Sequence, residues 1–410
     1  MFSTEVHVVS KSDNSKHATC ELEQSLAPLS ASSIRVRSRL ISLTSNNLTY
    51  ARGGGPPLHW WDTYPVPESC PAPYSNCDDW GVVPAWGYAD VVESRIDTIA
   101  TGSLLWGFWP ASGHAVQLQL EAKELPGHWK ETSEHRGRLM TVYNHYQQTK
   151  ESDARVMQLN ALCFPLWSGP NLLNLSTFSD QRIHPLGFDL PWSAEDADIS
   201  SAAVISLSAS SKTGRSLCWE LTRNRDTAAH GPLALLQLTS APETLPSFGT
   251  QLPVKSASYT EIDAAVSWVA EHTPSRVVIV DFGASDATLQ TLLAAVGSTS
   301  ASATVVAVGY ENRIYSSEEL QARKDTAVAK VQLNTSGLRD RTIAAIGAER
   351  YYRESEETWA RCVKDGTFGS ISVRMLRGVV GHQGIEGAWS DLCSRNVPPS
   401  QGLVIDLSEE

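Results

Sequence analysis

In the middle of the chain, mostly apolar runs of strand length alternate with helical stretches, and this alternation limits the fold more than any other feature. The apolar runs are residues 203–207, 233–238, 277–280 and 303–308. The predicted helices between them are residues 215–223, 261–272 and 286–296. Apolar strands of this kind are buried on both faces of a parallel sheet, and a strand–helix repeat builds βαβ units. The pattern therefore predicts a doubly wound, Rossmann-like α/β domain.

The two ends of the chain follow other patterns. Residues 33–43 and 114–120 alternate apolar and polar side chains with a period of two, which is typical of strands. Residues 56–84 form an insertion dense in Pro, Gly and aromatic residues, which we expect to be functional or packed on a surface. Near the C-terminus, an amphipathic helix is predicted around residues 354–363 and a strand at 402–407.

Composition and charge exclude several classes of protein. The chain has 410 residues, of which 41% are hydrophobic and 19% charged, as in a folded protein of two domains. Its net charge of −12 repels phosphate backbones and anionic lipids. The chain has neither an apolar run of about 20 residues nor a signal peptide's apolar centre near its start. We therefore expect a cytoplasmic protein with no nucleic-acid or membrane partner.

The seven cysteines do not predict a metal site. Cys70 and Cys77 lie close together, but the second pair of ligands that zinc needs is missing. A disulfide between these two is open, although a reducing compartment would keep both thiols free. The other cysteines are expected to be small core residues: Cys20, Cys163, Cys218, Cys362 and Cys393.

A short polar segment follows the first buried strand, where a dinucleotide-binding fold has its phosphate loop. A glycine spacing that ends at Gly214 would also fall on Ser208 and Ser211, which are not glycine. Hydroxyl groups and Lys212 can still hold an anion at a helix N-terminus, or else a serine only caps the helix. The candidate cofactor-binding residues of this segment are Ser210, Ser211, Lys212, Thr213 and Gly214.

Further candidates for the same ligand stand at the ends of two strands. No Asp follows the strand 233–238 to accept the ribose hydroxyls of NAD. Thr239 and Ser240 would accommodate the 2′-phosphate of NADP, although no Arg or Lys stands beside them. Asp281 ends the strand 277–280, where open α/β sheets place ligand groups, or it simply forms a turn.

Several segments carry a family resemblance. With the strand-rich start and the Rossmann-like middle, the C-terminal segments resemble the medium-chain dehydrogenase/reductase superfamily: 360–369, 387–392 and 401–407. Shorter motifs are similar to a microbial branch of this superfamily whose function is unknown: 48–51, 86–92, 106–110, 143–146 and 208–213.

The resemblance implies a domain plan and a chemistry. It implies a GroES-like domain at 1–137 with the insertion 56–84, a Rossmann-like domain at 138–333, and a return segment at 334–410 that completes the GroES-like domain. Zinc-dependent members have a Cys where Asn47 or Leu48 stands here, so zinc chemistry is not carried over. The chain thus resembles the zinc-independent quinone and enoyl reductases, which use a nicotinamide cofactor.

Five residues are candidates for catalysis without a metal. Tyr50 follows the segment that carries catalytic groups in the superfamily, and it either donates a proton or is a strand-edge aromatic residue. His114 begins a strand and either transfers protons or packs through a hydrogen bond. Residues 143–146 are expected in one helical turn, where Tyr143 and Tyr146 share a face. Tyr143, Tyr146 and Asn144 would then bind a carbonyl oxygen, and His145 is a candidate base.

We expect an NADP(H)-linked reductase of a carbonyl or conjugated C=C bond in an apolar, polyketide-type metabolite of secondary metabolism. Tyr50 or Tyr143 would supply the proton. One alternative is a nucleotide-independent lyase, hydrolase or isomerase with His114 or His145 as base; another is a noncatalytic binding protein. A homodimer is left open. Tryptophans expected to line an apolar pocket, or to pack in the core, are Trp60, Trp61, Trp106 and Trp109.

Overall fold

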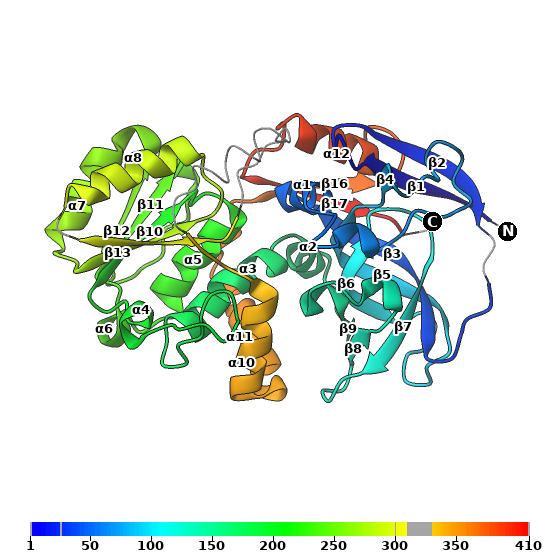
Figure 1. Ribbon diagram of the computed structural model, residues 1–410, viewed down its shortest axis with the longest axis horizontal. Coiled ribbons are helices and arrows are strands. Elements are labelled where there is room, and N and C mark those ends of the chain that lie inside the picture. The colour runs from blue at the N-terminus through cyan, green and yellow to red at the C-terminus, as the bar shows by residue number, and fades with distance from the viewer. Residues whose placement is uncertain (1, 25–26, 300, 310–329, 409–410) are drawn as a thin grey trace. The chain divides into compact units, whose positions relative to one another are not determined.

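A computed structural model of the chain is shown in Figure 1 and describes residues 2–24, 27–299, 301–309 and 330–408. The chain forms two compact units. Unit 1 comprises Met1–Pro165 and Ser372–Glu410, and unit 2 comprises Leu166–Ile371. Unit 1 is rich in β-strands and barrel-like, and unit 2 contains a parallel sheet flanked by helices, which confirms the predicted fold class. None of the described helices is both long and apolar enough to cross a membrane.

The units divide after Pro165 and Ile371, whereas the sequence placed the divisions after residues 137 and 333. Strand β9 (His145–Thr149) pairs with β6 and β8, so the chain leaves unit 1 later than expected. Helices α10 (Thr335–Ile346) and α11 (Ala348–Lys364) contribute Leu338 and Tyr351 to a core of unit 2. Local periodicity shows that a segment has an apolar face but not which core that face joins.

A closed ring of strands forms the centre of unit 1. Each strand of the ring pairs with the next, and the last pairs with the first: β3 (Ser33–Leu43), β5 (Pro84–Ser94), β6 (Leu104–Pro110), β9, β8 (His128–Glu131) and β7 (Val116–Ala122). The sheet continues beyond β3 through β17 (Gln401–Asp406) to β16 (Ser372–Arg377), so the returning C-terminal segment completes the unit. A second sheet has the order β2 (His17–Gln24), β1 (Phe2–Ser10), β4 (Trp80–Gly81).

Short helices of unit 1 connect these strands. Helix α1 (Ser45–Arg52) begins after Thr44, whose side chain accepts a hydrogen bond from the Asn46 N–H group in a capping box. The remaining helices and 3₁₀ turns are η1 (Trp60–Asp62), η2 (Glu134–Arg136), η3 (Thr141–Asn144), α2 (Ala154–Leu162) and α12 (Ile385–Cys393). Helix α3 (Phe164–Leu172) begins in unit 1 and continues into unit 2.

The sheet of unit 2 is parallel and has the strand order of a dinucleotide-binding fold. Its order, β12-β11-β10-β13-β14-β15, corresponds to 3-2-1-4-5-6 when the strands are numbered along the chain. The strands are β10 (Ala202–Leu207), β11 (Ala234–Thr239), β12 (Val254–Ser258), β13 (Arg276–Asp281), β14 (Ser302–Ala307) and β15 (Val331–Gln332). Every described pairing in this sheet is parallel.

Helices of unit 2 cover both faces of this sheet (Figure 1). Successive residues of β10 face opposite sides of the sheet. Ile205 lies in a core with α7 (Ile262–Glu271) and α8 (Asp286–Gly297), and Val204 lies in a core with α5 (Lys212–Arg223). Two-sided burial explains why these strands are apolar throughout. Within the described residues of unit 2, the remaining helical elements are η4 (Leu173–Thr177, a π-helix), α4 (Ala194–Ala197), α6 (Thr227–His230), η5 (Pro242–Thr244) and η6 (Tyr259–Glu261).

Candidate functional site

Two tyrosines from distant parts of the sequence meet in unit 1. Tyr50 of α1 and Tyr143 of η3 have ring centroids 5.8 Å apart at an interplanar angle of 84°, and their hydroxyls are hydrogen-bonded. The Tyr50 oxygen accepts hydrogen bonds from Asn46 Nδ2 at 2.7 Å and Trp86 Nε1 at 3.0 Å. Because two donors occupy this oxygen, the Tyr50 proton is left to bond with Tyr143.

Aromatic rings surround this tyrosine pair. Phe108 lies 5.0 Å from the ring of Tyr50 and 4.7 Å from that of Tyr143, measured between centroids. Trp60 contacts both tyrosines, at 4.9 and 5.8 Å. The cluster continues through stacked Trp86 and Trp106 to Phe164, and these last two side chains are half-buried.

Burial determines the charge state of the two phenols. It raises the pKa of Tyr50 well above its usual range and that of Tyr143 to about 12, where the interaction with the Tyr50 hydroxyl opposes the rise. Both hydroxyls are therefore protonated at neutral pH and can act as proton donors. Tyr143 is 9% exposed and Tyr50 3%, so Tyr143 is the member of the pair nearer to solvent.

The other candidate catalytic residues belong to different hydrogen-bonded groups. His114 is buried, bonds through Nδ1 to Ser112 Oγ at 2.8 Å, and has its pKa lowered by burial to about 4. His145 bonds through Nε2 to Nδ1 of His128 at 2.9 Å. The Asn144 side chain is engaged with the main chain and guanidinium of Arg136. The structure thus brings Tyr50 and Tyr143 together, places His114 and His145 in other hydrogen-bonded groups, and directs the Asn144 side chain to Arg136.

The expected helical turn over residues 143–146 is wrong. The 3₁₀ turn η3 ends at Asn144, and strand β9 starts at His145. Tyr143 therefore faces Tyr50, while the Tyr146 hydroxyl donates to the carbonyl oxygen of Phe108 at 2.9 Å. Pairing with β8 draws the segment into the barrel, where side chains alternate between faces instead of following a helical period.

The tryptophans predicted to line a pocket are divided between the aromatic cluster and the core. Trp60 and Trp106 belong to the cluster around the tyrosine pair. Trp109 is fully buried, and its Nε1 donates to the carbonyl of Gly87 at 2.9 Å. Trp61 packs so closely on Gly81 that a Cβ there would lie 2.2 Å from its ring. The insertion 56–84, which is part of unit 1, therefore contributes Trp60 to the cluster, while its Trp61 packs on Gly81.

The turn between β10 and α5 has the backbone geometry of a phosphate loop without its usual glycines. Ser208 has a φ of +65°, the conformation for which such loops use glycine. At Gly214 a Cβ would lie 2.7 Å from the Cα of Ala209, so glycine permits the close approach of helix and strand. Ser210 lies inside the turn, 4% exposed, where its Oγ accepts from Thr239 Oγ1 at 2.6 Å.

The remaining predicted cofactor residues lie nearer the surface of the turn or at a strand end. Ser211 caps α5 by accepting a hydrogen bond from the Gly214 N–H group at 3.0 Å. Lys212 and Thr213 are half-buried in the first turn of α5, and Ser240 is exposed after β11. This arrangement fits a phosphate group, since Lys212 adds a positive charge to the helix N-terminus.

Asp281, at the end of β13, serves the turn that follows it. Its Oδ1 accepts from the backbone N–H groups of Gly283 at 3.0 Å and Ala284 at 2.9 Å. Its Oδ2 pairs with Nζ of Lys330 at 3.0 Å, and the side chain is buried. Of the two roles that the sequence left open for Asp281, ligand binding and turn formation, this geometry corresponds to turn formation.

Among the described residues, no group of three or more His, Cys, Asp and Glu side chains could hold a metal ion. The cysteines are free thiols. Cys70 is buried and hydrogen-bonds to Cys20, whereas Cys77 is exposed. The disulfide between Cys70 and Cys77 that the sequence left open is therefore not formed.

Sequence reasoning missed the residues that hold the tyrosine pair in place: Asn46, Trp86, Phe108 and Arg136. Trp86 and Phe108 lie inside two of the quoted motifs, but nothing in those motifs marks them as neighbours of Tyr50. Arg136 is one of two arginines in a polar stretch, with Arg138, and carries no sequence signal of burial. Only the contacts made after folding identify these residues.

Comparison with known proteins identifies a family by sequence and a fold by structure. The model of a family described as protein of unknown function (DUF2855) matches residues 41–398. A search of curated protein sequences finds no match.

Solved structures share the fold along the whole chain. CurA from Vibrio vulnificus in complex with NADPH has a TM-score of 0.53 at 9% identity, over 99% of this chain and 100% of CurA. The mitochondrial 2-enoyl thioester reductase Etr1p/Etr2p heterodimer from Candida tropicalis has a TM-score of 0.55 at 8% identity, with the same coverage. The Etr1p complex with NADP and crotonyl-CoA has a TM-score of 0.54 at 8% identity, over 99% of this chain and 100% of that one. These likenesses support a medium-chain reductase-like fold.

Proposed function

The chain belongs to the DUF2855 family of proteins of unknown function, and we propose that it is a zinc-independent, NADP(H)-linked reductase of a conjugated C=C bond in an apolar carbonyl compound. The observation that carries this proposal is the hydrogen-bonded pair Tyr50 and Tyr143 inside an aromatic cluster. A reductase without a metal needs a proton donor that remains protonated at neutral pH, and both phenols meet this requirement.

Three features of unit 2 support a nicotinamide nucleotide as the hydride donor. The sheet has the strand order of a dinucleotide-binding fold. Ser208 and Gly214 give the β10–α5 turn the backbone of a phosphate loop. Ser211, Lys212 and Thr213 would hold the phosphates, and Ser240 stands where a 2′-phosphate would be read. CurA and Etr1p, which share the fold, are named with NADPH and NADP.

In this proposal the tyrosine pair stabilises the charge that develops on the substrate. When bound, the nucleotide would supply the hydride for the carbon β to the carbonyl. The Tyr143 hydroxyl donates a hydrogen bond to the carbonyl oxygen, where negative charge accumulates as the hydride adds. Tyr50, held by Asn46 and Trp86, would donate to Tyr143 and stabilise its oxygen as the Tyr143 proton passes to the enolate that hydride addition leaves, so that one hydride and one proton add across the C=C bond.

The aromatic cluster supports an apolar substrate. Trp106 and Phe164 are half-buried and continue the cluster from the tyrosine pair toward solvent. Rings of this kind bury acyl or polyketide-type chains and exclude water from the phenols, which strengthens each hydrogen bond to the substrate. The crotonyl thioester in the Etr1p complex belongs to this class, a short conjugated acyl group.

The turn also contains features that favour the nucleotide-independent alternative. Ser210 fills the inside of the turn, and the Tyr259 hydroxyl lies 3.2 Å from Ser208 Oγ. A lyase, hydrolase or isomerase would need an accessible base, and His114 and His145 are buried in other hydrogen bonds. The reductase therefore accounts for more of the structure.

The proposal is tested by nucleotide binding and turnover. Purified protein is titrated with NADPH and with NADH by fluorescence, and NADPH oxidation is followed with crotonyl-CoA and a quinone as probes. We expect saturable NADPH binding that Lys212→Ala weakens by about tenfold or more, since hydrogen bonds to charged groups contribute about 1.5–3 kcal/mol. Lys150→Ala, at an exposed position of unit 1, is the control. If no saturable binding is found up to about millimolar nucleotide, where the binding free energy is only about 4 kcal/mol, the proposal that this protein binds a nicotinamide nucleotide is refuted.

A further inference from the structure

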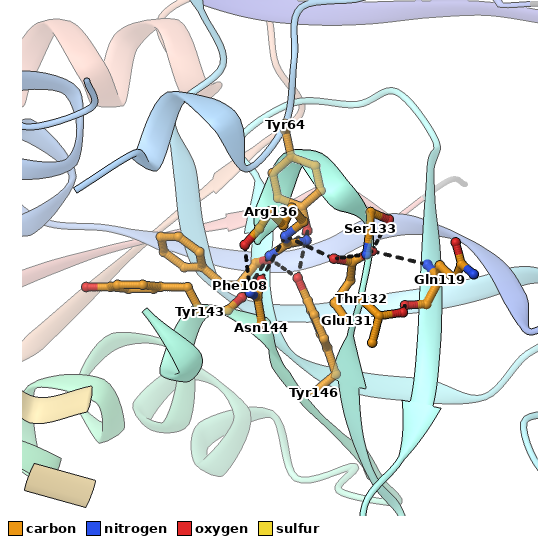
Figure 2. Close-up of polar contacts among 10 residues, drawn as sticks. All are labelled: Tyr64, Phe108, Gln119, Glu131, Thr132, Ser133, Arg136, Tyr143, Asn144 and Tyr146. Atoms are coloured by element: carbon orange, nitrogen blue, oxygen red, sulfur yellow. Dashed lines mark hydrogen bonds and ion pairs between the residues drawn. The ribbon is translucent and has the colours of Figure 1, made fainter. Parts of the chain in front are cut away.

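Arg136 is a fully buried arginine beside the tyrosine pair, and its bonds reach the main chain of Tyr143 (Figure 2). Its Nη2 donates to the Tyr143 carbonyl oxygen at 2.8 Å, and its Nε donates to Asn144 Oδ1 at 3.0 Å. The Asn144 amide donates in turn to the Arg136 carbonyl oxygen at 3.0 Å. These bonds join the ends of η2 and η3, the turns that precede β9.

The guanidinium lies between two tyrosine rings, and both tyrosines connect it to Phe108. Its Cζ atom is 5.1 Å from the ring centroid of Tyr64 and 5.5 Å from that of Tyr146. Both hydroxyls donate to the carbonyl oxygen of Phe108, at 2.7 and 2.9 Å. The Phe108 ring is the neighbour of Tyr143 at 4.7 Å. Arg136 is therefore connected to Tyr143 directly through its carbonyl and indirectly through Phe108.

Glu131 balances the buried positive charge. Its carboxylate is fully buried, with Oε2 3.5 Å from Nε of Arg136. It also accepts hydrogen bonds from the backbone N–H groups of Ser133 at 3.1 Å and Gln119 at 3.2 Å. The cost of desolvating a buried ion pair offsets most of its attraction, so such pairs add little net stability. What the pair supplies here is a defined geometry around η3.

We propose that Arg136 is a positioning residue that directs the phenol of Tyr143 toward Tyr50. In Figure 2 the Tyr143 ring points away from the guanidinium, so Arg136 acts through the main chain and not by touching the hydroxyl. A planar fork can bond the Tyr143 carbonyl and the Asn144 side chain at once, which the single ammonium group of lysine does not reproduce. This inference rests on the proposed reductase function and adds a residue to its machinery.

A double-mutant cycle in the full-length protein tests the proposal. Arg136→Lys keeps the charge and loses the fork, and we expect kcat to fall about 10- to 100-fold with KM nearly unchanged, as misplacement of a catalytic group costs rate. In a Tyr143→Phe background the same change should lower kcat less than about twofold, because the residue acts through Tyr143. The control Arg39→Lys, at a half-exposed ion pair with Asp90, should leave kcat unchanged.

Additive losses in the two backgrounds would overturn the positioning role, because they would show that Arg136 acts on the fold in general. If Arg136→Lys does not fold, Tyr64→Phe replaces it: it removes one hydroxyl from the Phe108 carbonyl, and its smaller loss of kcat must also disappear in the Tyr143→Phe background.

A second readout separates this proposal from the proposed function. The protein is labelled with 3-fluorotyrosine, and the Tyr143 resonance is assigned by its absence in Tyr143→Phe. We expect Arg136→Lys to shift this resonance and Arg39→Lys to leave it in place. An unshifted resonance refutes the positioning role even if reductase activity is found, and a shifted one supports it even if crotonyl-CoA is not reduced.

Discussion

Individual ionisable side chains of this protein are buried in ways that keep them uncharged at neutral pH. Burial lowers the pKa of His7 to about 3 and those of His114 and His128 to about 4. Burial raises the pKa of Tyr143 to about 12. A histidine of so low a pKa holds a proton poorly, whereas a phenol of so high a pKa keeps its proton and can donate it. These shifts favour tyrosine over histidine as the acid.

Replacing Tyr143 by Phe should abolish most of the activity. We expect kcat to fall about 10²- to 10⁴-fold, the range for loss of a proton donor, with little change in KM. Tyr50→Phe should have a smaller effect, because in the proposed mechanism Tyr50 acts on the substrate only through Tyr143. Steady-state oxidation of NADPH measures both variants.

The matched control for the tyrosine variants is Tyr88→Phe. The Tyr88 hydroxyl accepts from Asn160 Nδ2 at 2.8 Å, outside the tyrosine pair.

In the wild type, kcat should stay level to at least pH 9, since the Tyr143 phenol is still protonated there. Full activity in Tyr143→Phe would contradict the assignment.

At the scale of elements, helix α5 carries a buried carboxylate that no cation touches directly among the contacts the structure describes. Asn171 Nδ2 donates to Oε1 of Glu220 at 3.1 Å, and Asn174 and Asn224 donate to Oε2 at 3.1 and 2.7 Å. The oxygens of the last two amides accept from arginines, Arg225 at 2.9 Å and Arg361 at 2.8 Å. Each of these two amides thus accepts a hydrogen bond from an arginine and donates one to the carboxylate, so it links the two charged groups. Burial nevertheless raises the pKa of Glu220.

Glu220→Gln should stabilise the protein at neutral pH. Because the pKa of Glu220 is higher in the folded state, its carboxyl group costs no stability below the unfolded pKa, about 4.3. The free energy of unfolding then decreases as pH rises through the folded-state pKa, because the buried carboxyl group ionises. The neutral amide avoids that penalty. The Gln oxygen can keep the bonds from Asn174 and Asn224, and the Asn171 amide can turn to accept from the Gln nitrogen.

The measurement is the unfolding free energy of wild type and variant at several pH values between 4 and 8. We expect the two to agree near pH 4 and the variant to gain about 1 kcal/mol near pH 7. Glu220→Leu should lose stability at every pH, because it leaves buried amides without an acceptor. A variant that loses stability as pH rises, relative to wild type, would show that the carboxylate stabilises the fold.

On the scale of the whole molecule, the two units differ in how the chain builds their cores. Unit 2 is one continuous segment, Leu166–Ile371, with a core on each face of its sheet. Unit 1 is made of two segments, because its core includes side chains from both ends of the chain. The C-terminal segment contributes Leu376, Ile385, Trp389, Leu403 and Ile405 to this core.

These cores predict which fragments fold. Residues 166–371 expressed alone should unfold cooperatively on heating, because their core is complete within the segment. Residues 1–165 alone should not, since β3 loses its partner β17 and the core loses its C-terminal side chains. Joining residues 372–410 to residues 1–165 through a long Gly/Ser linker should restore the folding of unit 1. Circular dichroism and thermal unfolding measure all three fragments, and a cooperative 1–165 fragment would contradict this account.

The arrangement of the fold followed from local patterns, while parts of the site did not. Strand β3 occupies the residues predicted for it, Ser33–Leu43, because the alternation of apolar and polar side chains is a local property, although the fold buries residues of both faces. Residues 143–146 were assigned a helical turn from their composition, and pairing with β8 changed the segment into the start of a strand. Ser210 was predicted at a phosphate, and Thr239, from the next strand, holds it inside the turn.

By itself, the amino-acid sequence determined four strands of the parallel Rossmann-like sheet, the helices between them and the candidacy of Tyr50 and Tyr143. These depend on hydrophobic period and residue chemistry, which are local along the chain. Only the tertiary structure decided that the two tyrosines are hydrogen-bonded to each other and that Arg136 and Asn144 hold the turn beside them. The reason is physical: such contacts join residues far apart in sequence, and burial, which sets their protonation, exists only once the barrel has closed.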